Sequence, residues 1–310
     1  MQNPEDADTM ESIDGRSAVR LERKLTHPID KVWRAVTESQ HLGQWFPAEV
    51  EIEMATGGRV RFGQGGELMY GTVLTLDPPH EISFSWGDDI LTFELADADG
   101  GTRLRMTHTF DDRAGGASFA AGWQACLAAL GPVLADEPLP PTGRMIERHE
   151  ELVHRFGLDH GVVTESPDGW TIRFERQLTC PADIAWDLFL GRDQETGRQR
   201  TAPSVGEPLT PFAAPEVTLG IVTEMEVHRV LAFDTAASEP GDHVRLEFGP
   251  GTGHGARMLL TVRGSSSDDR THAYEQWGDG AVEHVAAEAS RWAVERASSP
   301  AGASAGGALQ

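Results

Sequence analysis

The sequence predicts an α+β protein made of two tandem copies of one domain, each a curved antiparallel sheet wrapped around a long C-terminal helix. Two observations lead to this fold class: an internal repeat, and a change in the first copy from alternating to helical spacing of apolar residues. The length of 310 residues is also a natural size for two domains. We place the first domain at residues 16–136, a linker with a short helix at 137–168, and the second domain at 169–297.

The repeat is clearest near the start of each copy. RLERKLTHPIDKVW at residues 20–33 and RFERQLTCPADIAW at residues 173–186 are identical at eight of fourteen positions. Because the loops between the matching segments differ in length, the copies share one topology and not one set of loops. Trp33 and Trp186 are one of these identical pairs. Further correspondences outside the segments are residues 71–73 with 220–222, and Trp123 with Trp277.

The spacing of apolar residues predicts the elements of the first copy in order. Pro28 ends a first strand, and a helix begins near Asp30. Apolar and polar residues then alternate in about six segments, which predicts an antiparallel sheet with one buried face. After Gly115-Gly116 the spacing changes to steps of three and four, which predicts a helix with one apolar face. A helix covers only part of a strongly curved sheet, so the space between them is the natural ligand site.

Five segments of the first copy resemble the SRPBCC (START-like, helix-grip) superfamily. The most similar branch is the bacterial relatives of the activator of heat-shock-protein-90 ATPase homologue, which overlaps with polyketide-cyclase-like proteins. The resemblance covers nearly all of the first copy and implies a helix-grip fold around an apolar cavity. It rests on PIDKVWRAVT at 28–37, HLGQWF at 41–46, GGRVRF at 57–62, TRLRMTHTF at 102–110 and GWQACLAAL at 122–130.

The second copy diverges where the cavity would open. In place of Trp45-Phe46 it has the polar segment GRDQETGRQRTAPSVGEPLTP at residues 191–211, which predicts a loop. The residue that corresponds to His108 is Val262. We therefore expect the working pocket in the first copy and a mainly structural second copy.

The predicted ligand-binding residues are the aromatic and inward-facing residues of the first copy. His108 is in phase with Met106, so it is either a core histidine or a polar group of the cavity wall, and it is the one candidate for catalysis. A tryptophan in such a wall could offer its N–H to a ligand. The full set is Trp45, Phe62, Phe84, Trp86, Phe93, Met106, His108, Phe119 and Trp123.

Three motif-like segments carry no cofactor or metal prediction. GPGTGHG at 249–255 lacks dinucleotide-loop spacing and precedes a strand, so it predicts a hairpin turn. His149 and His154 are five residues apart and cannot face one zinc ion from one helix. Cys126 and Cys180 fall in different copies and form neither a disulfide framework nor a metal set. We expect neither a cofactor nor a metal.

The net charge of the chain limits the classes of partner that we expect. Lys and Arg number 26 against 49 Asp and Glu, a formal net charge of −23, which disfavours phosphate backbones and anionic membranes. Residues 1–15 do not resemble a signal peptide, and no apolar run approaches the ~18 residues of a membrane span. We expect a cytoplasmic protein that binds neither nucleic acid nor membrane.

Three function classes remain open. The sequence favours non-catalytic binding of a small hydrophobic molecule, because no catalytic constellation accompanies the expected cavity. The second class is an enzyme of the polyketide cyclase or aromatase kind, with His108 as acid or base. The third, an interaction with a chaperone ATPase, is implied by the family resemblance alone.

Overall fold

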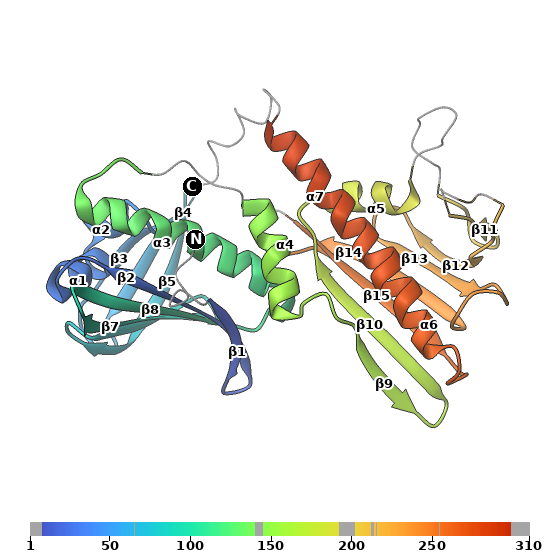
Figure 1. Cartoon of the computed structure of the whole chain (residues 1–310), viewed down its shortest axis with the longest axis horizontal. Helices are drawn as coiled ribbons and strands as arrows, with labels where there is room; N and C mark the ends of the chain where they lie inside the picture. The colour runs from blue at the N-terminus through green and yellow to red at the C-terminus, as the bar shows by residue number, and fades with distance from the viewer. Residues whose placement is uncertain are drawn as a thin grey trace. The chain divides into compact units, whose positions relative to one another are not determined.

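The computed structural model describes residues 8–64, 66–139, 145–191, 202–211, 214, 216–253 and 255–298. The chain divides into two compact units with the boundary between Leu152 and Val153. Each unit combines one antiparallel sheet with helices, as the sequence predicts (Figure 1).

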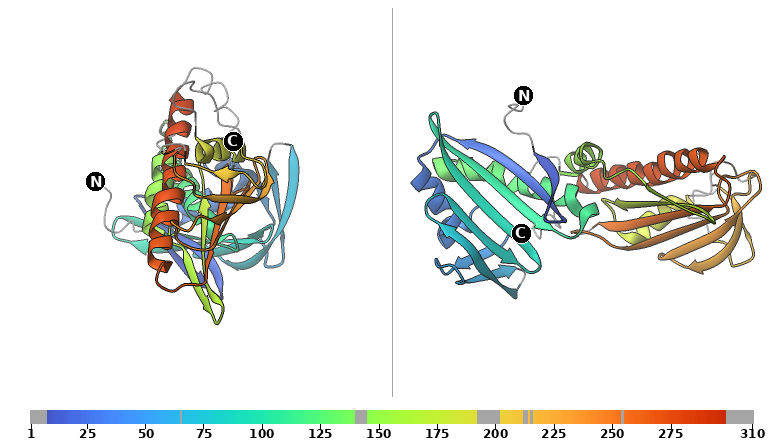
Figure 2. Two further views of the ribbon diagram at one scale, coloured as in Figure 1. Left: turned by 90° about the vertical axis from the view of Figure 1, so that its right-hand side faces the viewer. Right: turned by 90° about the horizontal axis from the view of Figure 1, so that it is seen from below.

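The first unit is built on an eight-stranded sheet in the order β1-β2-β8-β7-β6-β5-β4-β3. Its long helix, α3, lies along one face of this sheet (Figure 2). The strands are β1 (Thr9–Ile13), β2 (Arg16–Leu25), β3 (Glu49–Ile52), β4 (Arg59–Gln64), β5 (Glu67–Asp77), β6 (Glu81–Trp86), β7 (Asp89–Ala98) and β8 (Gly101–Phe110). The helices are α1 (Ile29–Thr37), α2 (Ser39–Leu42), the 3-10 turn η1 (Arg113–Gly115) and α3 (Gly116–Ala135), and the unit boundary falls within α4 (Met145–Phe156).

The second unit repeats this order with a seven-stranded sheet, β9-β10-β15-β14-β13-β12-β11. Its strands are β9 (Val162–Ser166), β10 (Gly169–Gln177), β11 (Pro208–Leu209), β12 (Gly220–Glu226), β13 (Val230–Thr235), β14 (His243–Pro250) and β15 (Ala256–Gly264). Its helices are α5 (Ala182–Leu190), α6 (Arg270–Tyr274), the π-helical η2 (Glu275–Val282) and α7 (Glu283–Ser298). The C-terminal helical segment therefore changes to π-helix around Trp277, a detail that its apolar spacing does not predict.

Strand pairing confirms the repeat at the level of single residues. His108 on β8 faces Val19 on β2, and Val262 on β15 faces Ile172 on β10 at the equivalent rung. Trp33 and Trp186 each occupy the fifth position of a nine-residue helix, α1 and α5. The alignment of Val262 with His108 is therefore correct.

Both sheets have an irregularity at the same rung. The register shifts between Val73 and Thr75 where β5 meets β6, and between Val222 and Glu224 where β12 meets β13. Such a bulge bends the strand and increases its twist, so both sheets curve at the same place.

A glycine two residues before each bulge is required by close backbone packing. A Cβ atom at Gly71 would lie 1.9 Å from the carbonyl oxygen of Ser85, and one at Gly220 would lie 2.1 Å from that of Asp234. Any side chain would overlap the neighbouring strand, so glycine is the residue that fits both positions.

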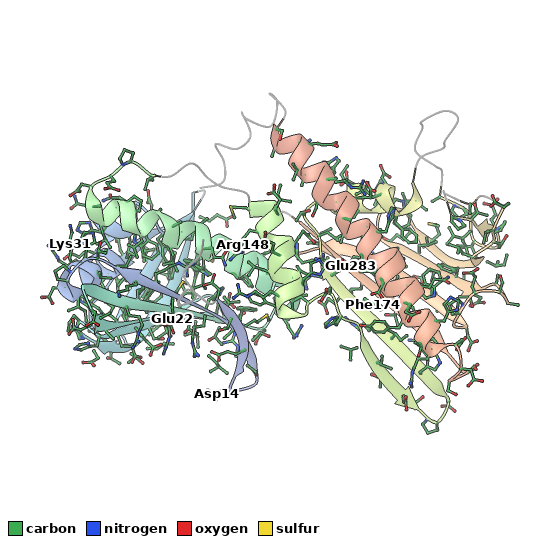
Figure 3. The ribbon with its side chains drawn as sticks, viewed as in Figure 1. Asp14, Glu22, Lys31, Arg148, Phe174 and Glu283 are labelled. Carbon is green, nitrogen blue, oxygen red and sulfur yellow. The ribbon has the colours of Figure 1, made fainter. Side chains whose placement is uncertain are left out.

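Two hairpin strands lie outside the predicted domain ranges. β1 precedes the predicted start of the first domain, and β9 falls in the predicted linker, yet each pairs with the following strand. Asp14, at the tip of the first hairpin, has a φ of 50° and forms a two-residue turn with Gly15 (Figure 3). Five-residue strands at a sheet edge have too little apolar alternation to be recognised from sequence.

An arginine explains why the alternation of the first strand breaks. Arg23 lies in phase with buried Leu21 and Leu25, and its Nη1 bonds Oδ1 of buried Asp8 at 2.9 Å. The equivalent Arg176 bonds Glu283, at the start of α7, with 3.2 Å between Nε and Oε1. Arg176 is buried and Arg23 is half-buried, and a cation removed from water needs such a partner.

The helix Arg113–Ala135 is long and apolar enough to span a membrane, by length and composition alone. This differs from the expectation of no such run. Its residues Ala117, Trp123, Leu127 and Leu130 are buried, and α3 packs on β2, so it is the core helix of its domain.

Candidate functional site

The inner face of the first sheet carries an aromatic cluster that continues onto α3. Successive ring contacts link eight of the predicted residues, with centroid distances between 4.7 and 6.3 Å. Trp86 and Phe119 are half-buried and the other six are buried. In order of contact they are Trp45, Phe93, Phe84, Phe62, Trp86, Trp123, His108 and Phe119. The ninth predicted residue, Met106, is buried opposite Phe93 on the neighbouring strand.

Phe46 lies among the tryptophans and was missed as a site residue. Its ring is 5.7 Å from Trp45, 5.4 Å from Trp86 and 5.3 Å from Trp123, centroid to centroid. It lies between α2 and β3, outside both elements, and is 7% exposed. The HLGQWF segment was the signal, but residue spacing could not show that Phe46 contacts three other aromatic residues. Phe110, in phase with His108 and in contact with Phe119, was also left out.

A hydrogen-bonded series of three side chains runs through the cluster. Nε1 of Trp123 donates to Nδ1 of His108 at 3.1 Å, and Nε2 of His108 lies 3.0 Å from Oδ2 of Asp89. His108 and Trp123 are buried, whereas the side chain of Asp89 is 31% exposed. Asp89 also lies 3.9 Å from Nη2 of Arg16. The series therefore leads from the domain surface into the aromatic cluster.

These bonds fix the tautomer of His108. An indole N–H can only donate, so Nδ1 of His108 must carry a lone pair. The proton of the neutral imidazole is then on Nε2, where it is donated to the Asp89 carboxylate. A histidine held in this way is both a core residue and a polar group of the cluster.

Asp89 was missed, although the sequence contained a signal for it. It is in phase with Leu91 and Phe93, which alternate on the inner face of β7. A two-residue turn at Gly87-Asp88 places it opposite Trp86. Aspartate is common in turns, so an aspartate at the first position of a strand is easily interpreted as part of the turn. The contact of Asp89 with His108 was therefore not predicted.

Trp45 offers no free donor, contrary to the expectation for a cavity wall. Its Nε1 donates to the carbonyl oxygen of Ala35 in α1 at 2.9 Å. This bond fixes the indole to the backbone of the first helix. Trp45 can therefore contribute an apolar surface to the cluster but not a hydrogen bond to a ligand.

The second unit has a different inner face. Val262 stands at the position of His108, and Nε1 of Trp277 donates to the carbonyl oxygen of Pro240 at 3.2 Å. Asp242, at the position of Asp89, accepts a bond from the backbone N–H of Ser265 at 2.6 Å. Of the segment 191–211, residues 192–201 lie outside the described residues, and Pro208–Leu209 forms β11 rather than loop.

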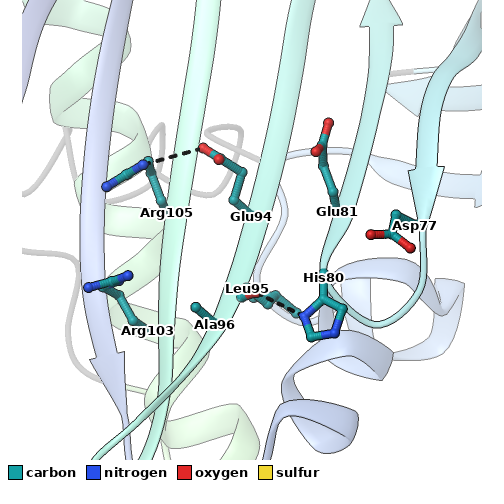
Figure 4. Close-up of a pocket in the computed structure, with 8 residues that line it drawn as sticks. All are labelled: Asp77, His80, Glu81, Glu94, Leu95, Ala96, Arg103 and Arg105. Atoms are coloured by element: carbon teal, nitrogen blue, oxygen red, sulfur yellow. Dashed lines mark hydrogen bonds and ion pairs between the residues drawn. The ribbon is translucent and has the colours of Figure 1, made fainter.

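Two equivalent hollows lie on the opposite, outer faces of the sheets, each with a volume of about 220 Å³. Strand register matches Glu81 and Glu94 of the first hollow with Val230 and Glu247 of the second. In the first hollow Arg105 reaches toward Glu94, at 3.9 Å (Figure 4). These hollows were not predicted, and their charged rims differ from the aromatic cluster on the inner face.

The described residues contain no group of three or more His, Cys, Asp and Glu side chains that could hold a metal ion. The two cysteines are free thiols, one in each unit. Burial raises the pKa of Cys126 to about 11 and that of Cys180 to about 12, so both are protonated at neutral pH. Neither has the properties of a reactive nucleophile.

The first domain is similar to known proteins. Residues 26–135 match the family model described as activator of Hsp90 ATPase homolog 1-like protein. A search of curated proteins found no match.

Solved structures similar to this chain include EF2215 of Enterococcus faecalis, described as a conserved protein of unknown function. The two are 22% identical, the match covers 48% of this chain and 89% of that chain, and the TM-score is 0.44. CalU16 of Micromonospora echinospora has 21% identity, 49% and 94% coverage and a TM-score of 0.39. MLL2253 of Mesorhizobium loti has 26% identity, 39% and 99% coverage and a TM-score of 0.35. The family match at residues 26–135 lies within the first domain, which is therefore similar in sequence to the activator of Hsp90 ATPase homolog 1-like proteins.

Proposed function

We propose that the first domain binds a small hydrophobic molecule between its sheet and α3, within the aromatic cluster. The observation that carries this proposal is the hydrogen-bonded series of Asp89, His108 and Trp123 inside an otherwise apolar cluster. Polar groups are costly to bury, so a hydrogen-bonded histidine among aromatic rings fits a site that orients a ligand.

Binding requires that a ring give way, because the rings of the cluster contact one another. Phe46 is the ring best placed to move, since it lies in the connection between α2 and β3. The other rings are on strands or on α3, except that of Trp45. The indole of Trp45 is held by its hydrogen bond to Ala35. Displacement of Phe46 would expose the surfaces of Trp86 and Trp123, which are 5.4 and 5.3 Å from its centroid.

The second domain serves mainly as structure in this proposal. Val262 cannot hydrogen-bond a ligand, and the N–H of Trp277 is bonded to Pro240. Its inner face therefore lacks the imidazole that we expect to orient a ligand in the first domain.

The test is a titration of the full chain with an anilinonaphthalenesulfonate dye, together with native mass spectrometry of the purified protein to detect a co-purified ligand. Trp123→Phe is compared with the matched control Trp277→Phe. We expect weaker dye binding in the first variant and unchanged binding in the second, with thermal melts showing that both are folded. Loss of dye binding only in Trp277→Phe would overturn the assignment to the first domain.

Acid–base catalysis at His108 is a second candidate, favoured by one observation. The carboxylate of Asp89 is 3.0 Å from Nε2 of His108, the arrangement by which a carboxylate orients a catalytic imidazole. Nδ1 would be the base, and it becomes available only when the N–H of Trp123 moves away. Turnover of a polyketide-like substrate that is lost in both His108→Val and Asp89→Asn would support this role. Turnover unaffected by either change would exclude it.

A further inference from the structure

The hydrogen bond between Trp123 and His108 connects the helix to the sheet across the proposed ligand site. Trp123 belongs to α3 and His108 to β8. The other indole bond described within the cluster, from Trp45, is made to the backbone of α1. A molecule that enters between α3 and β8 therefore meets one donor and one acceptor, which now satisfy each other at 3.1 Å.

Separating this pair without replacing it would leave two buried polar groups unsatisfied. The indole N–H needs an acceptor, and Nδ1 of His108 needs a donor. A buried group that loses its partner costs more than the hydrogen bond itself gained. A ligand that binds here must therefore supply an acceptor to the indole N–H and a donor to Nδ1.

A hydroxyl group is the simplest group that satisfies both. It can donate its proton to Nδ1 of His108 while its oxygen accepts from the N–H of Trp123. We infer that the ligand is an apolar molecule with a hydroxyl group, which is inserted between Trp123 and His108. This inference rests on the proposed function of the first domain.

Several other polar groups satisfy only half of the pair. An ether oxygen accepts from Trp123 but cannot donate to His108, and an ammonium group does the reverse. An ionised carboxylate also cannot donate, and it would bring a second negative charge close to Asp89, which is 3.0 Å from the other ring nitrogen of His108. A hydrocarbon leaves both groups unpaired.

The second domain provides an internal comparison. Its indole N–H, on Trp277, is bonded to a backbone carbonyl, and Val262 has no lone pair to offer. The acceptor there is a backbone carbonyl, which no side-chain substitution removes, whereas the acceptor in the first domain is the side chain of His108. His108→Val therefore converts the first site to the chemistry of the second at one position.

The experiment is equilibrium dialysis of the full chain against three probes of similar shape: 2-naphthol, 2-methoxynaphthalene and naphthalene. We expect 2-naphthol to bind at least tenfold more tightly than the other two, because a site built to hydrogen-bond a hydroxyl rejects analogues that lack it. In His108→Val we expect this preference to disappear, so that the affinities for 2-naphthol and naphthalene become about equal. In Trp123→Phe the acceptor remains, so 2-naphthol should still be preferred over 2-methoxynaphthalene.

The possible outcomes separate this inference from the proposal on which it rests. If none of the probes binds, the proposed function itself is wrong. If all three bind equally to the unmodified chain, the domain binds hydrophobic molecules but the hydroxyl inference is wrong. A preference for 2-naphthol that persists in His108→Val would also overturn it. A nitrogen NMR signal of His108 that shifts with 2-naphthol, and not with naphthalene, gives a further readout that needs no variant.

Discussion

In the first domain the indole N–H of Trp123 donates to a histidine side chain, whereas in the second domain that of Trp277 donates to a backbone carbonyl. The two indoles occupy equivalent helices, and the strands beneath them share their register. The difference lies in one position, His108 against Val262. It teaches that duplication preserved the framework of the domain while the polar chemistry of its interior was free to change.

Removal of the two indoles should have the largest effect and should affect both domains alike. We expect Trp123→Ala and Trp277→Ala each to lower the free energy of unfolding by ~3–5 kcal/mol, because each removes a buried aromatic side chain. Hydrogen exchange followed by mass spectrometry would show which domain is destabilised. A loss confined to one variant would mean that the two helices do not have equivalent packing.

The carboxylate partners of Arg23 and Arg176 differ in burial and should distinguish the two domains. Asp8→Ala leaves Arg23 without its carboxylate partner, and we expect a loss of ~3 kcal/mol in urea unfolding. Glu283→Ala should cost only ~1 kcal/mol, because the Glu283 side chain is 27% exposed and water can replace it. Asp8→Asn, which keeps a hydrogen-bond acceptor, serves as the control. Equal losses in the two alanine variants would contradict the difference in burial.

Introducing histidine at position 262 or valine at position 108 should lower the free energy of unfolding in both cases. Val262→His buries an imidazole without a designed partner, and we expect a loss of ~2 kcal/mol. His108→Val leaves the N–H of Trp123 unpaired, for a loss of ~1 kcal/mol. Thermal melts of both variants, with near-ultraviolet circular dichroism to follow the tryptophans, would measure this. A gain in stability in His108→Val would show that the histidine is kept only for ligand binding.

The thiols should give the smallest effect. Burial raises the pKa of Cys126 to about 11 and that of Cys180 to about 12, so a neutral thiol reagent should modify both slowly in the folded chain. Cys180 is buried and Cys126 only half-buried, so Cys126 should react first. Since the folded pKa values exceed the ordinary value of 9.0, this contribution to stability is complete below pH 9 and falls as the pH rises toward 11–12. Faster labelling of Cys180 would contradict the order of burial.

The sequence was sufficient for the repeat, the sheet and the long helix, because period-2 alternation and steps of three and four are local patterns. It also aligned His108 with Val262 correctly. The partners of His108 could not be read in this way, since Asp89 lies 19 residues before it in the chain and meets it only through strand pairing. Phe46 was missed for the same reason, because two of its aromatic neighbours, Trp86 on β6 and Trp123 on α3, are distant in the chain.

The bulges at Val73/Thr75 and Val222/Glu224, with Gly71 and Gly220 beside them, have a consequence for engineering. The curvature of each sheet is set by the backbone at these positions, away from the strands that carry His108 and Val262. Interior residues of β15 can therefore be redesigned without remodelling the bend. The second domain can therefore serve as a scaffold for designed binding sites. The first domain of the same chain is the reference with which each redesigned site is compared.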